Sequence, residues 1–206
     1  MTKGLIIVIS APSGAGKTTI YRELLSRMPG AVFSVSVTTR KSRKGEVDGR
    51  DYFFISEKKF RRMVSGGQLA EWARVHGHYY GTPKKQLRDA VSSGRDIVLD
   101  IDVQGGRKIR KQYLSGVFIF ILPPSLKALE HRLRNRGQDD EQTIRVRLEN
   151  ARKEISYITD YDYLVINDKL NEAVEQARSI ITAEHARISR LKNEISGFKK
   201  AQAGNA

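Results

Sequence analysis

The chain of 206 residues contains no cysteine, and its 37 lysines and arginines outnumber 23 aspartates and glutamates, for a formal net charge of +14. These features exclude a disulfide framework, thiol catalysis and thiolate metal sites, and no apolar run approaches the length of a membrane span. Because the N-terminus also lacks the pattern of a secretion signal, we expect a soluble cytoplasmic protein, built as one domain with inserted subdomains.

The excess of positive charge indicates an anionic ligand or a nonspecifically basic surface. Nucleotides and nucleic acids both meet that description. The sequence has no helix-turn-helix or zinc-finger pattern and lacks the aromatic-rich signature of RNA-reading sheets. Nucleic acid is therefore the less favoured partner.

The first predicted elements are a strand and a helix on either side of a glycine-rich turn. The apolar run 5–9 predicts a buried strand, and apolar residues at positions 20, 24 and 28 predict a helix. The turn between them reads APSGAGKT, which in this strand–loop–helix context is typical of a phosphate-binding loop. Its members are Ala11, Pro12, Ser13, Gly14, Ala15, Gly16, Lys17 and Thr18.

This turn predicts an ATP-binding site. Glycines let backbone N–H groups turn inward, and the following helix adds the positive end of its dipole. Lys17 is then placed to reach the β- and γ-phosphates, and Thr18 to ligate Mg²⁺. Ala11 replaces the usual first glycine of the motif, which is tolerable if its φ is negative. The alternative interpretation is a glycine turn with a surface lysine.

Residues 34–92 predict an inserted subdomain. Alternating β-type stretches occur at 33–38 and 51–55, glycines occupy positions 45 and 49, and a helical segment carries Phe60 and Met63. This composition interrupts the regular succession of core strands and helices.

Three further apolar runs, at 97–100, 117–122 and 163–166, predict strands of one parallel sheet with helices on both faces. Ligands bind beyond the carboxyl ends of such strands, where the phosphate loop and Asp100 both fall. Asp102 lies two residues further on, so that both carboxylates point to the same side. We expect Asp100 to organise Mg²⁺ through water and Asp102 to face the substrate. The alternatives are ordinary loop aspartates or a two-metal hydrolase site, which the scattered histidines disfavour.

Residues 125–151 predict a helical lid. Ser125 follows two prolines and can cap a helix, and Gly137 separates that helix from a second one. Arginines near this glycine can stabilise the charge of phosphoryl transfer when a lid closes. They are Arg132, Arg134, Arg136, Arg145 and Arg147. The alternative interpretation is a solvated basic face.

Six sequence blocks follow one another along the chain: SAPSGAGKTT (10–19), SVSVTTRKSRKGEVDGRDYFF (34–54), EWARVHGHYYGT (71–82), LDIDVQG (99–105), FILPPS (120–125) and RLRNRGQDDE (132–141). Together they resemble the guanylate kinase family, over a span that reaches from the phosphate loop to positions 167–168. The resemblance implies transfer of the ATP γ-phosphate to GMP, giving ADP and GDP with Mg²⁺ as cofactor, in purine nucleotide metabolism.

The resemblance also implies a division of the chain. An α/β fold is expected, with a parallel-sheet P-loop NTPase core, an inserted mixed α/β subdomain for the nucleoside monophosphate, and a helical lid. The domain would span 1–182, with core segments 1–33, 93–124 and 152–182, the GMP-binding subdomain at 34–92 and the lid at 125–151. Residues 183–206 read as a basic helix that fades into a disordered end.

Matching positions carry the family's GMP-binding roles. The resemblance assigns the acceptor nucleotide and its phosphate to Ser36, Arg40, Arg43, Tyr52 and Tyr80. It assigns the guanine edge to Glu71, Thr82 and Asp102, and the adenine side of ATP to Asn167. Ser42 departs from the family, which commonly has proline between the two arginines; this loosens the loop and removes no ligand.

We interpret the reaction as an in-line transfer without a covalent enzyme intermediate. Its catalytic residues would be Lys17, Arg40, Arg136 and Arg147. Alternatives are another nucleoside-monophosphate kinase, a guanylate-kinase-like module for protein interaction, and a nucleic-acid-binding ATPase. The sequence leaves the use of dGMP and the oligomeric state open.

Overall fold

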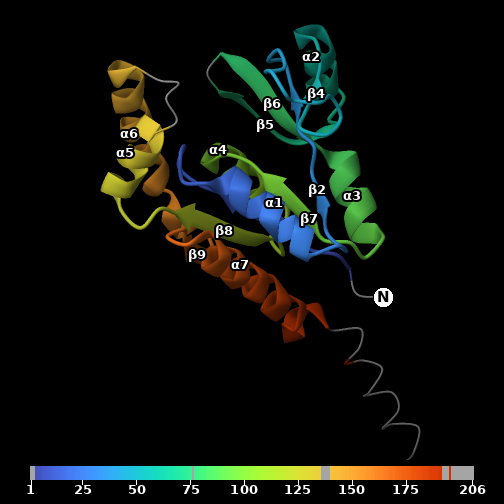
Figure 1. The fold of residues 1–206 in the computed structure, drawn as a ribbon. Coiled ribbons are helices and arrows are strands. Elements are labelled where there is room, and N and C mark those ends of the chain that lie inside the picture. Colours follow the sequence, from blue (N-terminus) through green and yellow to red (C-terminus); the bar gives the residue numbers. More distant parts are fainter. Residues whose placement is uncertain (1–2, 76, 136–139, 192–194, 196–206) are drawn as a thin grey trace, which may run out of the picture.

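A computed structural model of the chain describes residues 3–75, 77–135, 140–191 and 195 (Figure 1). The core is a five-stranded sheet in the order β2-β7-β1-β8-β9, and every pair of neighbours in it is parallel. The strands are β1 (Ile6–Ser10), β2 (Val32–Phe33), β7 (Ile97–Asp100), β8 (Val117–Leu122) and β9 (Tyr163–Ile166). The predicted α/β class with a parallel core sheet is confirmed.

Strand β1 occupies the centre of this sheet and is buried along its whole length. Its side chains alternate between two apolar layers, which explains why the sequence shows a continuous apolar run. Ile7 and Ile9 pack in the layer that contains α1 (Lys17–Arg27) and α7 (Leu170–His185). Ile6 and Val8 pack in the layer that contains α3 (Lys84–Ser92) and α4 (Val103–Gln112).

A second, four-stranded sheet forms the inserted subdomain, in the order β4-β3-β6-β5. Its strands are β3 (Val37–Thr38), β4 (Phe53–Phe54), β5 (Leu69–Val75) and β6 (His78–Pro83), and α2 (Glu57–Ser65) packs on it. The predicted helical segment is α2. The antiparallel hairpin of β5 and β6 was not expected from the sequence. The stretch 33–38 is divided, because Phe33 belongs to the core sheet and Val37 to the second sheet.

The region predicted as a lid folds into two helices, α5 (Leu126–Asn135) and α6 (Glu141–Ile155). The Ser125 hydroxyl accepts a hydrogen bond from the Ala128 N–H at 3.0 Å, which confirms the expected cap. Leu129 and Leu133 are buried against Ala151 of the second helix. These helices and the second sheet lie on the same side of the core sheet (Figure 1), where the phosphate loop emerges.

The C-terminal end of α7 is tied to the core by buried acidic groups. Glu184 is 3% exposed and accepts hydrogen bonds from the Tyr163 hydroxyl and from Arg190. Asp96 accepts the Leu5 N–H at 2.8 Å with one oxygen and pairs with His185 at 2.8 Å with the other. The chain then forms a 3-10 turn at Ile188–Arg190, and the end of the predicted tail lies outside the described residues.

We expect Glu184→Ala to lower the free energy of unfolding by about 2–4 kcal/mol, because it leaves Arg187, Arg190 and the Tyr163 hydroxyl without their buried acceptor. Urea denaturation measures this change. Glu172→Ala on the same helix is the matched control, since Glu172 pairs with Lys169 at the surface. Equal unfolding midpoints for the two variants would contradict the structural role of Glu184.

Candidate active site

The phosphate loop joins the carboxyl end of β1 to the N-terminus of α1. Gly14 and Gly16 adopt φ angles of +93° and +91°, a region that side chains strongly disfavour. The Ala15 N–H bonds the Pro12 carbonyl at 3.1 Å and closes the turn. The backbone therefore has the form that presents N–H groups and a helix N-terminus to an anion.

Lys17 and Asp100 meet at the carboxyl ends of β1 and β7. The Lys17 Nζ lies 2.6 Å from the Asp100 Oδ1 and donates to the Ile101 carbonyl at 3.1 Å. Both side chains are largely buried, at 21% and 16% exposure. The structure thus brings together two residues that the sequence placed at separate strand ends.

Asn167 and Arg132 hold the phosphate loop through the carbonyl of Ala15. The buried Asn167 Nδ2 donates to the Ala15 carbonyl at 2.8 Å. Arg132 from α5 donates to the Asn167 carbonyl at 2.8 Å and lies 3.4 Å from the same Ala15 oxygen. A residue of the predicted lid and a residue after the last core strand therefore hold the loop jointly.

Glu154 of α6 also contacts the loop, although the sequence analysis did not single it out. Its Oε2 accepts the Ser13 N–H at 3.3 Å. Burial raises the pKa of Glu154 above its ordinary value. Helical position 154 carries no motif that distinguishes it from a surface glutamate, so only the tertiary structure shows this contact.

A cavity of about 270 Å³ opens next to Lys17, and two of the predicted guanine-reading residues, Glu71 and Asp102, line it. The third, Thr82, is fully buried and does not line it. Glu71 on β5 is 6% exposed, and its Oε1 accepts the Thr82 hydroxyl from β6 at 2.7 Å. Burial raises the pKa of Glu71 to about 7, while the hydrogen bond from Thr82 opposes the rise. Asp102 lines the same cavity and caps α4 by accepting the Gly105 N–H at 2.8 Å.

An adjoining cavity of about 240 Å³ gathers the predicted phosphate ligands. Ser36, Tyr52, Tyr80 and Asp100 line both cavities, and Arg40 and Arg43 line only this one. Burial, with the nearby Asp100 carboxylate, raises the pKa of Tyr52, so that its hydroxyl stays a neutral donor. The position is suited to a phosphate attached to a base in the first cavity.

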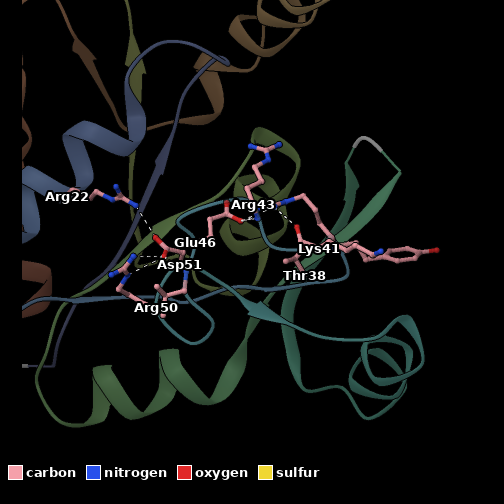
Figure 2. A network of polar contacts seen from close by, with 10 residues as sticks. Arg22, Thr38, Lys41, Arg43, Glu46, Arg50 and Asp51 are labelled. Atoms are coloured by element: carbon pink, nitrogen blue, oxygen red, sulfur yellow. Dashed lines mark hydrogen bonds and ion pairs between the residues drawn. The ribbon is translucent and has the colours of Figure 1, made fainter. Parts of the chain in front are cut away.

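Glu46 holds the side chain of Arg40 and the backbone of Arg43 in this cavity. It binds the Arg40 guanidinium through two hydrogen bonds of 2.8 and 2.9 Å, and it accepts the Arg43 N–H at 2.7 Å. Figure 2 shows Glu46 beneath Arg43 in this network. The pairing with Glu46 raises the pKa of Arg40. One edge of the Arg40 guanidinium is thereby fixed to the protein.

Of the two lid arginines predicted to be catalytic, Arg147 lies within the described residues and Arg136 does not. Arg147 on α6 lines a third cavity, of about 400 Å³, together with Ser13 and Asp102. It therefore faces the space between the phosphate loop and the guanine-reading pocket. Arg136 lies outside the described residues.

Magnesium has a small set of protein oxygens available in this region. Thr18 and Asp100 line the same cavity, and their hydroxyl and carboxylate are donors that Mg²⁺ prefers. The described residues contain no group of three or more histidine, aspartate or glutamate side chains arranged to hold a metal ion. This arrangement suits an ion that arrives with a nucleotide and takes most of its ligands from phosphate and water.

Comparison with known proteins identifies the family. The family model described as guanylate kinase matches residues 3–184. The chain belongs to the guanylate kinase family. A guanylate kinase from Thermotoga maritima is 46% identical and covers 98% of both chains. One from Nitratidesulfovibrio vulgaris is 50% identical over 88% of this chain and 87% of its own length. A crystal structure of guanylate kinase from Anaplasma phagocytophilum, 37% identical, superposes with a TM-score of 0.78, covering 92% of this chain and 90% of that one.

Membership of this family identifies the chain as an ATP:GMP phosphotransferase of the P-loop class. The predicted resemblance is confirmed over nearly the full sequence.

We expect Gly16→Ala to damage the phosphate loop more than its backbone strain alone explains. A Cβ at this position would lie 2.4 Å from the Asn167 Nδ2, which must then move and release the Ala15 carbonyl. Gly45→Ala is the matched control, because Gly45 has nearly the same φ, +89°, and no atom within 4 Å of its Cβ position.

Gly45→Ala should cost about 1 kcal/mol of unfolding free energy with unchanged ATP affinity. Gly16→Ala should cost more and weaken ATP binding at least about tenfold, a change of 1.4 kcal/mol or more. Urea unfolding and calorimetric titration measure both effects. Equal ATP affinity in the two variants would refute the contact with Asn167 as the cause.

Proposed function

We propose that the chain transfers the γ-phosphate of ATP directly to GMP in an Mg²⁺-dependent, in-line reaction, and that it returns GMP to the cytoplasmic purine nucleotide pool. The observation that carries this proposal is the buried pair of Glu71 and Thr82 beside the phosphate loop. None of the helices in the described ranges combines the length and apolar composition of a membrane span.

The Glu71 carboxylate provides selectivity for guanine. Guanine presents two adjacent donors, N1–H and the 2-amino group, which an ionised carboxylate accepts together. Adenine presents an acceptor at N1 and would leave the buried carboxylate unpaired. Sites of this kind discriminate by about 10⁴-fold. The Thr82 hydroxyl holds one proton, which must turn away from Glu71 to reach guanine O6.

The acceptor phosphate binds in the adjoining cavity. Arg40 and Arg43 supply charge, while Tyr52, Tyr80 and Ser36 supply neutral hydroxyl donors. Glu46 holds Arg40 in place before the nucleotide arrives. GMP therefore meets an Arg40 guanidinium that is already oriented, which reduces the conformational entropy lost on binding.

The donor phosphates bind at the loop amides and Lys17. Asn167 supports the loop through Ala15, and we assign it to the adenine side of ATP from the family resemblance. Thr18 and Asp100 would hold Mg²⁺, which supplies charge neutralisation of the phosphates when it is bound. Asp100 pairs with Lys17, and both side chains line the guanine-reading cavity.

Catalysis in this scheme consists of positioning and charge stabilisation. The GMP phosphate is anionic at neutral pH, so that it needs no strong general base and no covalent enzyme intermediate. Arg147 and Arg136 close over the transferring group with the lid. Closure also excludes water, which would otherwise hydrolyse ATP.

A coupled assay of ADP formation, with GMP present and absent, tests the proposal. ADP should form only with GMP, stop when EDTA removes the metal, and resume when Mg²⁺ is restored. GMP binding without ADP formation would indicate an interaction module. ADP formation that depends on added nucleic acid and not on GMP would indicate an ATPase of a different kind.

Lys17→Ala should lower turnover by about 10²–10³-fold, because it removes the charge that stabilises the transferring phosphate. GMP affinity should stay within about threefold of the wild-type value, since the acceptor's proposed ligands are intact. Initial rates and calorimetric titration with GMP measure the two quantities. Loss of GMP affinity together with turnover would show that the proposed division between donor and acceptor sites is wrong.

Lowering the pH from 8 to 6 should weaken GMP binding about tenfold through Glu71 alone. Its pKa of about 7 means that the carboxyl is mostly protonated at pH 6 and cannot accept both guanine donors. The GMP phosphate titrates near pH 6 as well. The Glu71→Gln variant isolates the contribution of the GMP phosphate. We expect this variant to bind GMP weakly at every pH and to retain only the pH dependence that comes from the phosphate. The same pH slope in both proteins would reject Glu71 as the base reader.

A further inference from the structure

Two arginines of different origin bind the carboxylate of Asp51 (Figure 2). The Arg22 Nη2 lies 3.0 Å from Oδ1, and the Arg50 Nη2 lies 3.0 Å from Oδ2. The two arginine side chains are similarly exposed, at 62% and 67%, whereas the Asp51 side chain is 12% exposed. The two ion pairs differ in the parts of the chain that they connect.

Arg50 belongs to the same loop as Asp51, so that its ion pair is local. Arg22 projects from α1, the helix that begins at Lys17 and belongs to the ATP-binding core. Its ion pair therefore crosses from the core to the GMP-binding subdomain. Arg22 and Asp51 also line the acceptor-phosphate cavity, and Arg50 does not.

Asp51 links Arg22 to the loop segment that holds the phosphate-binding arginines. Its Oδ2 accepts the Val47 N–H at 2.9 Å. The neighbouring residue Glu46 holds both the Arg40 guanidinium and the Arg43 N–H. Hydrogen bonding from Val47 outweighs burial and keeps the pKa of Asp51 below its usual range, so that the carboxylate is charged at neutral pH.

We propose that Arg22 is a positioning residue for GMP, which fixes the loop of Arg40 and Arg43 at the correct distance from α1 through its ion pair with Asp51. The inference rests on the proposed function. An exposed ion pair contributes little to folding stability. It acts here on the geometry of the cavity, since it restrains the loop before the nucleotide binds.

A series at position 22 tests this role, with position 50 as the matched control. Arg22→Ala should raise the KM and the calorimetric Kd for GMP about two- to fivefold, the range expected for one exposed ion pair. Arg22→Glu should raise both further, because it opposes Asp51 with a like charge. Arg22→Lys should restore most of the affinity. The Kd for ATP should not change, and kcat should stay within about twofold.

Arg50→Ala and Arg50→Glu should leave the KM for GMP at the wild-type value, although they alter the charge beside the same carboxylate. The effect of Arg22→Ala should diminish in an Asp51→Asn background and at high salt, which screens exposed pairs. Equal changes at positions 22 and 50, or unchanged GMP affinity in all variants, would overturn the inference. A wild-type protein that does not phosphorylate GMP would overturn the proposed function instead.

Discussion

The juxtaposition of Lys17 and Asp100 is the constraint on which the active site depends. In the parallel pairing of β1 with β7, Ile9 lies opposite Asp100, so that the phosphate loop emerges directly beside a strand-end carboxylate. The 2.6 Å ion pair between Lys17 and Asp100 is a consequence of that register. Both substrate cavities open from this point, and Asp100 lines each of them. The two cavities proposed for the base and the phosphate of GMP therefore both adjoin the strand end that carries Asp100.

Burial of Glu71 illustrates how the second sheet adds selectivity to that core. A carboxyl group with little access to water resists ionisation, and its pKa rises accordingly. A base that presents two adjacent hydrogen-bond donors, as guanine does, compensates the cost of burying the carboxylate. A base that presents a hydrogen-bond acceptor at that position does not. The hairpin of β5 and β6 supplies both Glu71 and Thr82 from opposite strands, which fixes their separation. In the proposed mechanism, the inserted subdomain provides the selectivity for guanine, and the subdomain and the core together bind the phosphates.

Elements with strong local patterns were predictable from the sequence. The continuous apolar strands, the glycine-rich turn and the Ser125 cap each have a backbone reason that operates within a few residues. The β5 and β6 hairpin escaped prediction because the buried Glu71 and the exposed Trp72 break its polar–apolar alternation. Glu46, Asp51 and Glu154 escaped because their partners lie on other elements or across a loop. A charged residue in a highly charged chain carries no local sign of such a contact.

In the proposed mechanism, the buried carboxylate of Glu71 beside the phosphate loop selects the acceptor nucleotide. Rates of ADP formation with GMP, AMP, CMP and UMP, each supplied with ATP and Mg²⁺ at equal concentration, test it most directly. We expect kcat/KM for GMP to exceed that for AMP by about 10⁴-fold, with still less activity toward the pyrimidine nucleotides. Comparable rates with GMP and AMP, or preference for any acceptor other than GMP, would contradict it.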